Sequence, residues 1–380
     1  MGREATGRRY KRGRRPNIHP RASPGLTPHA RGVMFDAITE SMSQFVASNF
    51  ARPKPRHLPD LPPIKRVSDR VVRILGMNPS EFTLQGTNTY LVGTGPSRWL
   101  IDTGEGRREY IPLLRKAMED EGVTGLEGIL LTHWHGDHTG GLRDVRALMK
   151  DLGVDAPVLA YKRIRAGNGE RAVRTNDNPH GDVDDPERGR CYVDVKDGDA
   201  FRCEGATIRA LHTPGHTPDH VVFTLEEEGS MFAGDCVLNG NTTTFENLGE
   251  YTASLRRMAE ALPRGGALFP SHGDVVEDGH KKLEEYMRHR SMREEMFMEA
   301  LKEDWVTRPE RGGMTASELC RAVYAHQVSY MVLVTACEGI TRQHLAKMTE
   351  EGRVIAEGGR GGWGWPGEVR YVPAAGEVAR

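Results

Sequence analysis

The stretch Thr132-His133-Trp134-His135-Gly136-Asp137-His138-Thr139-Gly140-Gly141 places three imidazoles and a carboxylate within six consecutive positions. Neutral imidazole suits zinc and similar divalent ions, and a carboxylate adds a hard oxygen ligand that offsets positive charge. The preceding Gly128-Ile129-Leu130-Leu131 is typical of a short buried strand, and the two glycines permit a sharp turn into a helix. We therefore predict a site for a pair of metal ions at the end of a strand in a layered α/β protein.

The pattern His-x-His-x-Asp-His after an apolar strand resembles the signature of the metallo-β-lactamase superfamily. Members of that superfamily fold as an αββα sandwich around one or two metal ions. They also supply a third histidine, a bridging aspartate and a last histidine, each after its own strand. All three are present here as His216, Asp235 and His272, and each follows a strand-like segment. The resemblance therefore predicts an α/β fold of this sandwich type.

The same resemblance implies which residues bind metal. A first zinc ion would be held by His133, His135 and His216, and a second by Asp137, His138 and His272, with Asp235 bridging the two. Metal binding lowers the pKa of water to roughly 7 to 9 and so supplies a hydroxide near neutral pH. We assign catalytic roles to Asp137 and Asp235, and Asp137 would orient this hydroxide. His212 and His220 are expected to orient a ligand from outside the metal site.

Length and composition fit a metalloenzyme with an additional domain. A chain of 380 residues is longer than one average domain needs. No apolar run approaches the roughly 18 residues of a membrane span, so we expect no membrane contact. The five cysteines are odd in number and contain no Cys-x-x-Cys pair. Reduced thiols in an intracellular compartment are therefore expected.

The first 35 residues are basic, with nine Lys or Arg and only Glu4 as an acid. This surplus of eight positive charges, set against the total of −1, leaves −9 for the remainder of the chain. The leader is too polar for a secretory signal. A mitochondrial transit peptide, a nuclear or nucleic-acid-binding arm, and a true start at Met34 instead of Met1 all stay open. The expected location is mitochondrial or cytoplasmic.

Proline content and periodicity divide the chain into parts. Residues 1–65 are predicted to be a disordered, basic and proline-rich leader, since proline favours extended chain. Residues 66–280 are predicted to form the catalytic domain. Its first strands and helix are expected at residues 71–75, 89–92, 99–102 and 108–121. The stretch 163–190 lacks hydrophobic periodicity and predicts a long surface loop near the mouth of the site.

Residues 281–380 predict a linker helix and a winged-helix-like domain. A long charged helix is expected at 279–303, with an inner stripe of Leu283, Tyr286, Met287, Met292, Met296 and Leu301. Thr315-Ala316-Ser317-Glu318 matches a capping box that opens a short helix, and a second helix is expected near 341–351. Strand-like segments at 353–357 and 369–372 flank a glycine-rich turn and predict a two-stranded wing.

The segment Thr83–Gly93, the metal motifs, the stretch Gly234–Glu246 and the winged-helix end together resemble the β-lactamase-like protein 2 family over residues 66–373. Two branches share this layout: mitochondrial-type endoribonucleases acting on single-stranded RNA, and fungal thioesterases releasing polyketides from an acyl carrier protein. The Asp235-Cys236 pair is closer to the first branch. We therefore predict a zinc-dependent endoribonuclease-like hydrolase, with hydrolysis of acyl carrier protein or CoA thioesters, as in secondary metabolism, as the alternative.

Charge does not select between these substrates. Residues 307–380 hold nine basic and eight acidic side chains, whereas nucleic-acid binders usually carry a basic face. The wing is therefore expected to pack on the catalytic domain or to support a homodimer. A third hypothesis is a non-enzymatic winged-helix regulator with a structural metal. That protein needs a closed coordination shell, whereas two zinc ions sharing seven protein ligands leave positions open.

Overall fold

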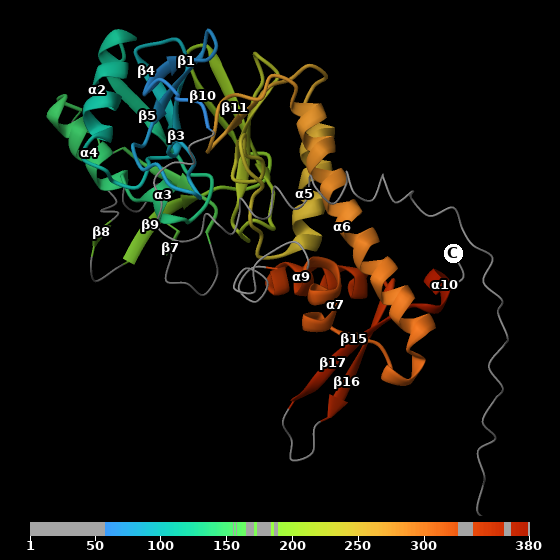
Figure 1. Ribbon diagram of the computed structural model, residues 1–380. Coiled ribbons are helices and arrows are strands. Elements are labelled where there is room, and N and C mark those ends of the chain that lie inside the picture. The colour runs from blue at the N-terminus through green and yellow to red at the C-terminus, as the bar shows by residue number, and fades with distance from the viewer. Residues whose placement is uncertain are drawn as a thin grey trace, which may run out of the picture. The chain divides into compact units, whose positions relative to one another are not determined.

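The catalytic part of the protein is an α/β sandwich of four layers in the order helix, sheet, sheet, helix (Figure 1). The computed structural model describes residues 58–378 except for 155, 157, 165–170, 173–183, 186–188, 326–336 and 361–365. The basic leader up to residue 57 lies outside the described residues. The layered α/β architecture predicted from the sequence is confirmed.

The first sheet has nine described strands in the order β1-β2-β3-β4-β5-β6-β9-β7, and β8 pairs with β9. The first four strands pair antiparallel, and β4, β5, β6 and β9 are parallel to one another. The strands are β1 (Ile64–Arg66), β2 (Val71–Leu75), β3 (Asn88–Val92), β4 (Ser97–Ile101), β5 (Gly125–Leu130), β6 (Ala160–Lys162), β7 (Arg171–Ala172), β8 (Asp184–Asp185) and β9 (Gly189–Asp194).

The second sheet has the order β10-β11-β12-β13-β14 among the described strands. Its members pair antiparallel except for the parallel pair β13 and β14. They are β10 (Ala200–Cys203), β11 (Ala206–His212), β12 (Val221–Leu225), β13 (Ser230–Gly234) and β14 (Leu268–Pro270).

Alternation along the strands explains how the layers pack. In β3, Leu91 faces the outer helices, whereas Tyr90 and Val92 face the second sheet. This is the period of two that a strand imposes, because successive side chains point to opposite faces. One core therefore lies between the sheets, a second lies under α2 (Tyr110–Asp120) and α4 (Leu142–Asp151), and a third lies under α5 (Leu248–Ala261) and α6 (Gly279–Thr307).

A smaller C-terminal domain follows the long helix α6 (Figure 1). A capping box opens its first helix: the Thr315 hydroxyl accepts from the Glu318 amide and the Glu318 carboxylate accepts from the Thr315 amide, as the sequence predicted. The remaining elements are η1 (Pro309–Arg311), β15 (Met314–Thr315), α7 (Ala316–Tyr324), α9 (Glu338–Glu350), β16 (Val354–Arg360), β17 (Pro366–Pro373) and α10 (Ala375–Val378). The two-stranded wing is present as β16 and β17, and β15 adds a third strand.

Two parts of the fold differ from the sequence prediction. The first strand is β1, which begins inside the stretch 1–65 predicted to be a disordered leader and pairs with β2. The stretch 163–190 is more than a loop, because its described parts include β7, β8 and the start of β9. Pairing with the sheet edge explains both differences, since such long-range contacts leave no local periodicity.

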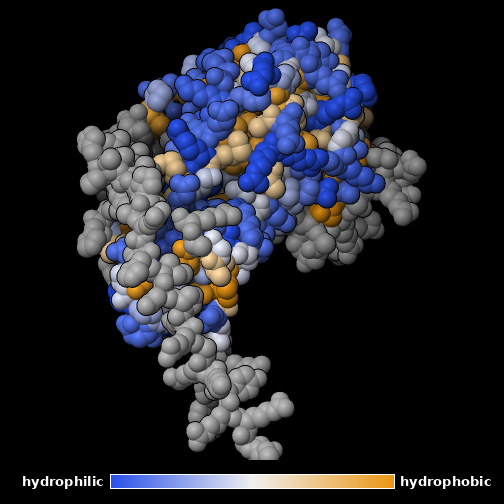
Figure 2. All heavy atoms as spheres, turned by 90° about the vertical axis from the view of Figure 1, so that its right-hand side faces the viewer, coloured by the Kyte–Doolittle hydropathy of each residue, from blue (hydrophilic) through white to orange (hydrophobic). Residues whose placement is uncertain are grey.

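The surface is mostly hydrophilic on the face shown in Figure 2, with hydrophobic side chains in scattered patches. The large hydrophobic side chains that are exposed in the described chain are Phe82, Val306, Ile355, Val369 and Val378. Within the described ranges, no helix is both long and apolar enough to cross a membrane.

Candidate metal centre

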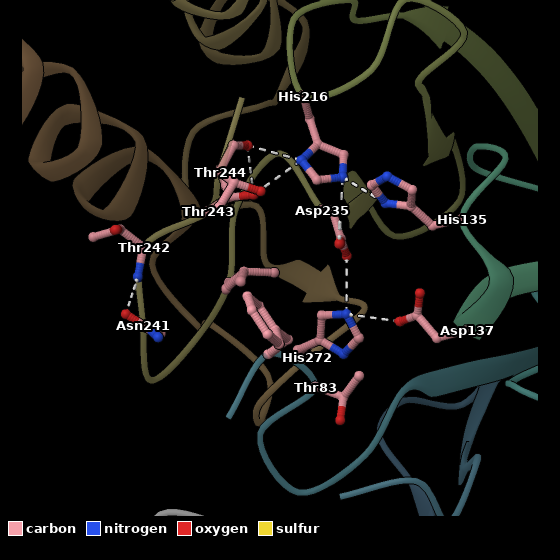
Figure 3. Close-up of a pocket in the computed structure, with 12 residues that line it drawn as sticks. Thr83, His135, Asp137, His216, Asp235, Asn241, Thr242, Thr243, Thr244 and His272 are labelled. Atoms are coloured by element: carbon pink, nitrogen blue, oxygen red, sulfur yellow. Dashed lines mark hydrogen bonds and ion pairs between the residues drawn. The ribbon is translucent and has the colours of Figure 1, made fainter. Parts of the chain in front are cut away.

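The structure brings all seven predicted metal ligands together at one end of the two sheets. Figure 3 shows those that line the pocket: His135, Asp137, His216, Asp235 and His272. His133 and His135 follow β5, and the short helix α3 (Gly136–Thr139) carries the next two ligands. His216 follows β11, Asp235 directly follows β13, and His272 follows β14. Strand ends are favourable places for such a site, because each strand fixes the start of the loop that carries the ligand.

Tight backbone contacts hold the His-x-His-x-Asp-His loop in place. The helix α4 begins directly after Gly141, as the two glycines predicted. A Cβ atom on Gly141 would lie 2.1 Å from the carbonyl oxygen of Thr103, and one on Gly140 would lie 2.6 Å from that of Glu105. Only glycine permits this approach, so these positions fix the loop against the end of β4.

Three imidazole nitrogens of the first group converge on one point. The Nε2 atom of His133 lies 2.8 Å from Nδ1 of His135, and Nε2 of His216 lies 3.2 Å from each of these atoms. Tetrahedral zinc with Zn–N bonds of about 2.0 to 2.1 Å separates its ligand nitrogens by about 3.3 Å. The donor set and its spacing therefore fit a zinc ion or a similar divalent ion.

The second group contains Asp137, His138 and His272. The Asp137 carboxylate oxygen Oδ2 lies 3.2 Å from Nε2 of His138 and 3.4 Å from Nε2 of His272. One oxygen and two nitrogens again face a common point, and this mixture suits a divalent ion. The Nε2 atom of His138 is buried and has no hydrogen-bond partner among the described residues, as expected of a metal-binding nitrogen.

Asp235 lies between the two groups. Its Oδ1 is 3.5 Å from Nε2 of His138 and 3.3 Å from Nε2 of His272. Its Oδ2 is 3.5 Å from Nε2 of His216 and 4.0 Å from Nε2 of His133. One carboxylate oxygen therefore faces each group, which is the arrangement that a bridging ligand requires.

Burial keeps the first group of imidazoles neutral. Burial, reinforced by His138 and His216, lowers the pKa of His133 well below its usual value. Burial and His216 also lower the pKa of His135 to about 4. At pH 7 both rings are therefore unprotonated, and the neutral ring is the form that binds metal.

In the second group, nearby carboxylates raise the pKa of the histidines instead. Burial alone would lower the pKa of His138, but Asp137 and Asp102 outweigh it and raise that pKa well above its usual value. Asp235 likewise outweighs burial and raises the pKa of His272 to about 9. The carboxylates thus create a region of negative potential in which positive charge is stabilised.

Asp102 is a functional residue that the ligand motifs did not reveal. Its Oδ2 lies 2.8 Å from Nδ1 of His138, and its Oδ1 accepts a hydrogen bond of 2.9 Å from the amide of Thr132. The Thr132 hydroxyl lies 3.0 Å from Nδ1 of His133. These contacts fix the rings so that each Nε2 faces the metal site. The sequence feature that could have identified Asp102 is its position directly after β4, the strand that neighbours β5, after which His133 and His135 lie.

His216 and His220 are fixed by other partners. The Nδ1 of His216 donates to the carbonyl oxygen of Thr244 at 2.8 Å, which leaves Nε2 free to bind metal (Figure 3). The Nε2 of His220 accepts a hydrogen bond of 3.0 Å from the amide of Asp235. This contact agrees with the expectation that His220 orients a ligand from outside the site, which stays a prediction. His212 instead contacts the carbonyl oxygen of Pro218 and lies outside both groups.

The loop that carries His272 is held by Asn88 of β3. The Nδ2 of Asn88 donates to the carbonyl oxygens of Pro270 and Gly273 at 2.8 and 2.7 Å, on either side of the ligand. The amide of Asn88 donates to the carbonyl oxygen of Ser271 at 2.7 Å. A buried asparagine in the first sheet therefore positions a predicted metal ligand at the end of the second sheet. No local sequence pattern indicates this contact.

A pocket of about 300 Å³ opens beside the metal ligands. Its floor consists of His135, His216, His272, Asp137 and Asp235, and its walls of Phe82, Thr83, Leu238, Asn241, Thr242, Thr243 and Thr244 (Figure 3). The floor is charged, whereas the walls are apolar or carry hydroxyl and amide groups. A polar reacting group on the floor and an uncharged group along the walls are what such a pocket accommodates.

Comparison with known proteins agrees with this geometry. The metallo-β-lactamase superfamily matches residues 82–277, and the β-lactamase-associated winged-helix domain matches residues 315–363. A β-lactamase domain protein from Burkholderia ambifaria has a similar fold, with a TM-score of 0.63 at 20% sequence identity. That similarity covers 85% of this chain and 97% of the Burkholderia chain.

Curated relatives are similar over most of their length. An atrochrysone carboxyl ACP thioesterase from Aspergillus novofumigatus is 37% identical over 301 residues, which are 78% of this chain and 84% of the relative. The lactamase-like protein nscB from Aspergillus fumigatus is 40% identical over 310 residues, which are 80% of this chain and 84% of the relative. The chain therefore belongs to the metallo-β-lactamase superfamily of hydrolases and carries its associated winged-helix domain.

Proposed function

We propose that this protein is a thioesterase that hydrolyses acyl thioesters of a carrier protein and depends on two zinc ions. His133, His135 and His216 would hold one ion, Asp137, His138 and His272 the other, and Asp235 would bridge them. When bound, the ions would acidify a water molecule and polarise the thioester carbonyl. The domain boundaries at 65/66 and 280/281, an intracellular location and a homodimer remain predictions beside this proposal.

The observation that carries the proposal is the relationship to carrier protein thioesterases. The Aspergillus novofumigatus relative with that name matches 78% of this chain and 84% of its own length at 37% identity. A second thioesterase of the same name, from Passalora fulva, is also 37% identical over 78% of this chain. Similarity at this identity over more than three quarters of both chains supports a shared substrate class more strongly than a shared fold does.

The pocket also favours a thioester over RNA. Its described lining includes no lysine or arginine, and its walls are formed by apolar, hydroxyl and amide side chains. Binding of an RNA strand requires cationic groups that neutralise phosphates, whereas an uncharged acyl chain does not. The relatives therefore support the alternative that the sequence left open, and the endoribonuclease prediction finds no support in them.

The residues of the pocket suit this chemistry. The hydroxyl of Thr87 donates to Oδ2 of Asp137 at 3.1 Å and so orients this carboxylate on the pocket floor. Asp137 is placed to accept a proton from an attacking water. The leaving group is an alkyl thiol, which is a much stronger acid than an alcohol, so it can depart as a thiolate without a strong acid. That requirement agrees with the described pocket lining, which contains no lysine, tyrosine or cysteine.

The test compares both substrates with one enzyme preparation. Purified protein should release free acid from an acyl-pantetheine or acyl carrier protein thioester, and His133→Ala should abolish that activity. The control is His289→Ala, because His289 lies on α6 outside both metal-binding groups. Cleavage of an unstructured oligoribonucleotide that disappears in His133→Ala, without thioester hydrolysis in the wild type, would refute the proposal.

A further inference from the structure

The segment Leu238–Glu246 forms one wall of the pocket and is here named the pocket strap. It connects Asp235 to α5 and contributes five lining residues: Leu238, Asn241, Thr242, Thr243 and Thr244. Within the described strap no residue belongs to a helix or a strand. Contacts from elsewhere in the chain must therefore set its conformation, because an irregular segment has no hydrogen-bond ladder of its own.

Tyr286 of α6 contacts the strap at three polar atoms. Its hydroxyl accepts a hydrogen bond of 3.0 Å from the amide of Leu238. The same hydroxyl lies 2.7 Å from the carbonyl oxygen of Asn241 and 3.0 Å from that of Leu238, and it donates its one proton towards these acceptors. Only 2% of Tyr286 is exposed, and burial raises the pKa of its hydroxyl, so the proton is retained at pH 7.

Arg290, one helical turn later, packs against the other end of the strap. Its guanidinium lies over the rings of Phe245 and Tyr251, at 5.2 and 5.6 Å from their centroids. It is buried, and no described carboxylate lies within ion-pair distance of it. Aromatic faces stabilise such a cation, and Nη2 of Arg290 also donates to the carbonyl oxygen of Thr243 at 3.5 Å. These contacts fix the position of the strap relative to α6.

The strap is also tied to the C-terminal domain and to the metal site. Gln343 of α9 donates from Nε2 to the carbonyl oxygen of Glu246 at 2.9 Å. On the opposite side, the carbonyl oxygen of Thr244 accepts from Nδ1 of His216 at 2.8 Å. The strap therefore lies between the metal ligands and two helices, α6 and α9.

We propose that Tyr286 is a positioning residue that sets the pocket wall by fixing Leu238 and Asn241, so that α6 and the C-terminal domain determine which acyl groups fit. The link to acyl groups rests on the proposed function, whereas the link between Tyr286 and the strap does not. Tyr286 acts through the strap and does not line the pocket itself. A small acyl group reaches the floor without using this wall, but a bulky one packs along it.

The first test measures the strap directly and needs no substrate. In Tyr286→Phe the Leu238 amide loses its acceptor, so hydrogen–deuterium exchange of a peptide covering Leu238–Thr244 should accelerate about five- to tenfold. Tyr324→Phe is the matched control, because Tyr324 is equally buried and its hydroxyl has no hydrogen-bond partner among the described residues. Unchanged exchange in Tyr286→Phe, or equal acceleration in both variants, would overturn the positioning role.

The second test measures selectivity with the metal-loaded enzyme. Tyr286→Phe should raise KM for a bulky aromatic acyl thioester at least about threefold, with kcat and KM for an acetyl thioester within about twofold of wild type. Bound metal should be unchanged. An equal loss on both substrates would refute selection by the wall. If the wild type hydrolyses no thioester but exchange still accelerates, the proposed function fails while the positioning role of Tyr286 stands.

Discussion

Replacing Asp102 with asparagine should test how the metal site is held in place. In the wild type, one carboxylate oxygen accepts from Nδ1 of His138 at 2.8 Å and the other accepts from the Thr132 amide at 2.9 Å. The substituted asparagine can keep the hydrogen bond to Thr132 but presents an amide donor to His138. The asparagine NH2 group and the Nδ1–H of His138 would then both be donors facing each other. The ring proton of His138 therefore moves to Nε2, which is the nitrogen that must be unprotonated to bind metal.

The size of the effect follows from the role of this carboxylate beside a metal-binding ring. Removing an outer partner of a metal-binding histidine typically costs 10- to 100-fold in metal affinity or activity, which corresponds to about 1.4 to 2.8 kcal/mol. Backbone strain should not contribute. Asp102 has a φ of 58°, and asparagine tolerates this left-handed region about as well as aspartate does.

The assay is a competition titration with a zinc chelator, in parallel with steady-state thioester hydrolysis. Asp197→Asn is the control, because Asp197 is a half-exposed carboxylate paired with Arg257 at 2.5 Å and lies outside both metal-binding groups. We expect Asp102→Asn to weaken metal binding mainly in the second group, because Asp102 bonds directly to His138. It reaches His133 of the first group only through Thr132, whose amide hydrogen bond the asparagine can keep. Affinities for both ions within about twofold of wild type would refute this reasoning.

Two further predictions concern the bridge and the C-terminal domain. Asp235→Ala should reduce the bound metal at both sites in elemental analysis, because its two oxygens face different groups; two tightly held ions would contradict a bridge. Burial lowers the pKa of His344 to about 4, so between pH 6.5 and 4 the unfolded state binds a proton that the folded state does not. Folding stability should therefore fall by up to about 3 kcal/mol on acidification through this window. Over the same pH range, denaturant unfolding of the metal-free proteins should show a smaller loss of stability for His344→Gln than for the wild type. Equal losses of stability in the two proteins would contradict this.

The sequence predicted those parts of the site that have a local pattern. The spacing in the His133 motif indicated a metal site, and the resemblance to the metallo-β-lactamase superfamily supplied the assignment of His216, Asp235 and His272, each after a strand-like segment. The structure places all seven together. Strand positions were similarly predictable, because β2, β3 and β4 coincide with short, mostly apolar segments that are buried on both faces. The capping box at Thr315 and Glu318 is formed by one short stretch of chain, and it was found for the same reason.

Contacts between distant segments were not predictable in this way. Asn88 holds the loop around His272 from a strand more than 180 residues earlier in the chain. The inner stripe expected on α6 is buried at Leu283, Tyr286, Met296 and Leu301, and Met287 and Met292 are partly buried. The helix also buries Arg290, which a hydrophobic pattern does not include. Both depend on neighbours that only the folded chain supplies, so a single sequence contains no signal for them.

The choice between RNA and thioester was based on two neighbouring residues, Asp235 and Cys236, and the structure gives these residues different roles. Asp235 turns its carboxylate to the metal ligands, whereas Cys236 is fully buried in the core under α5 and α6. Burial also raises the pKa of the Cys236 thiol to about 12, so it is inert at neutral pH. The residue after the aspartate therefore reflects core packing and not substrate, although the sequence comparison of branches relied on it. Residues that face the pocket, such as Phe82 and Leu238, are the ones whose identity should follow the acyl group.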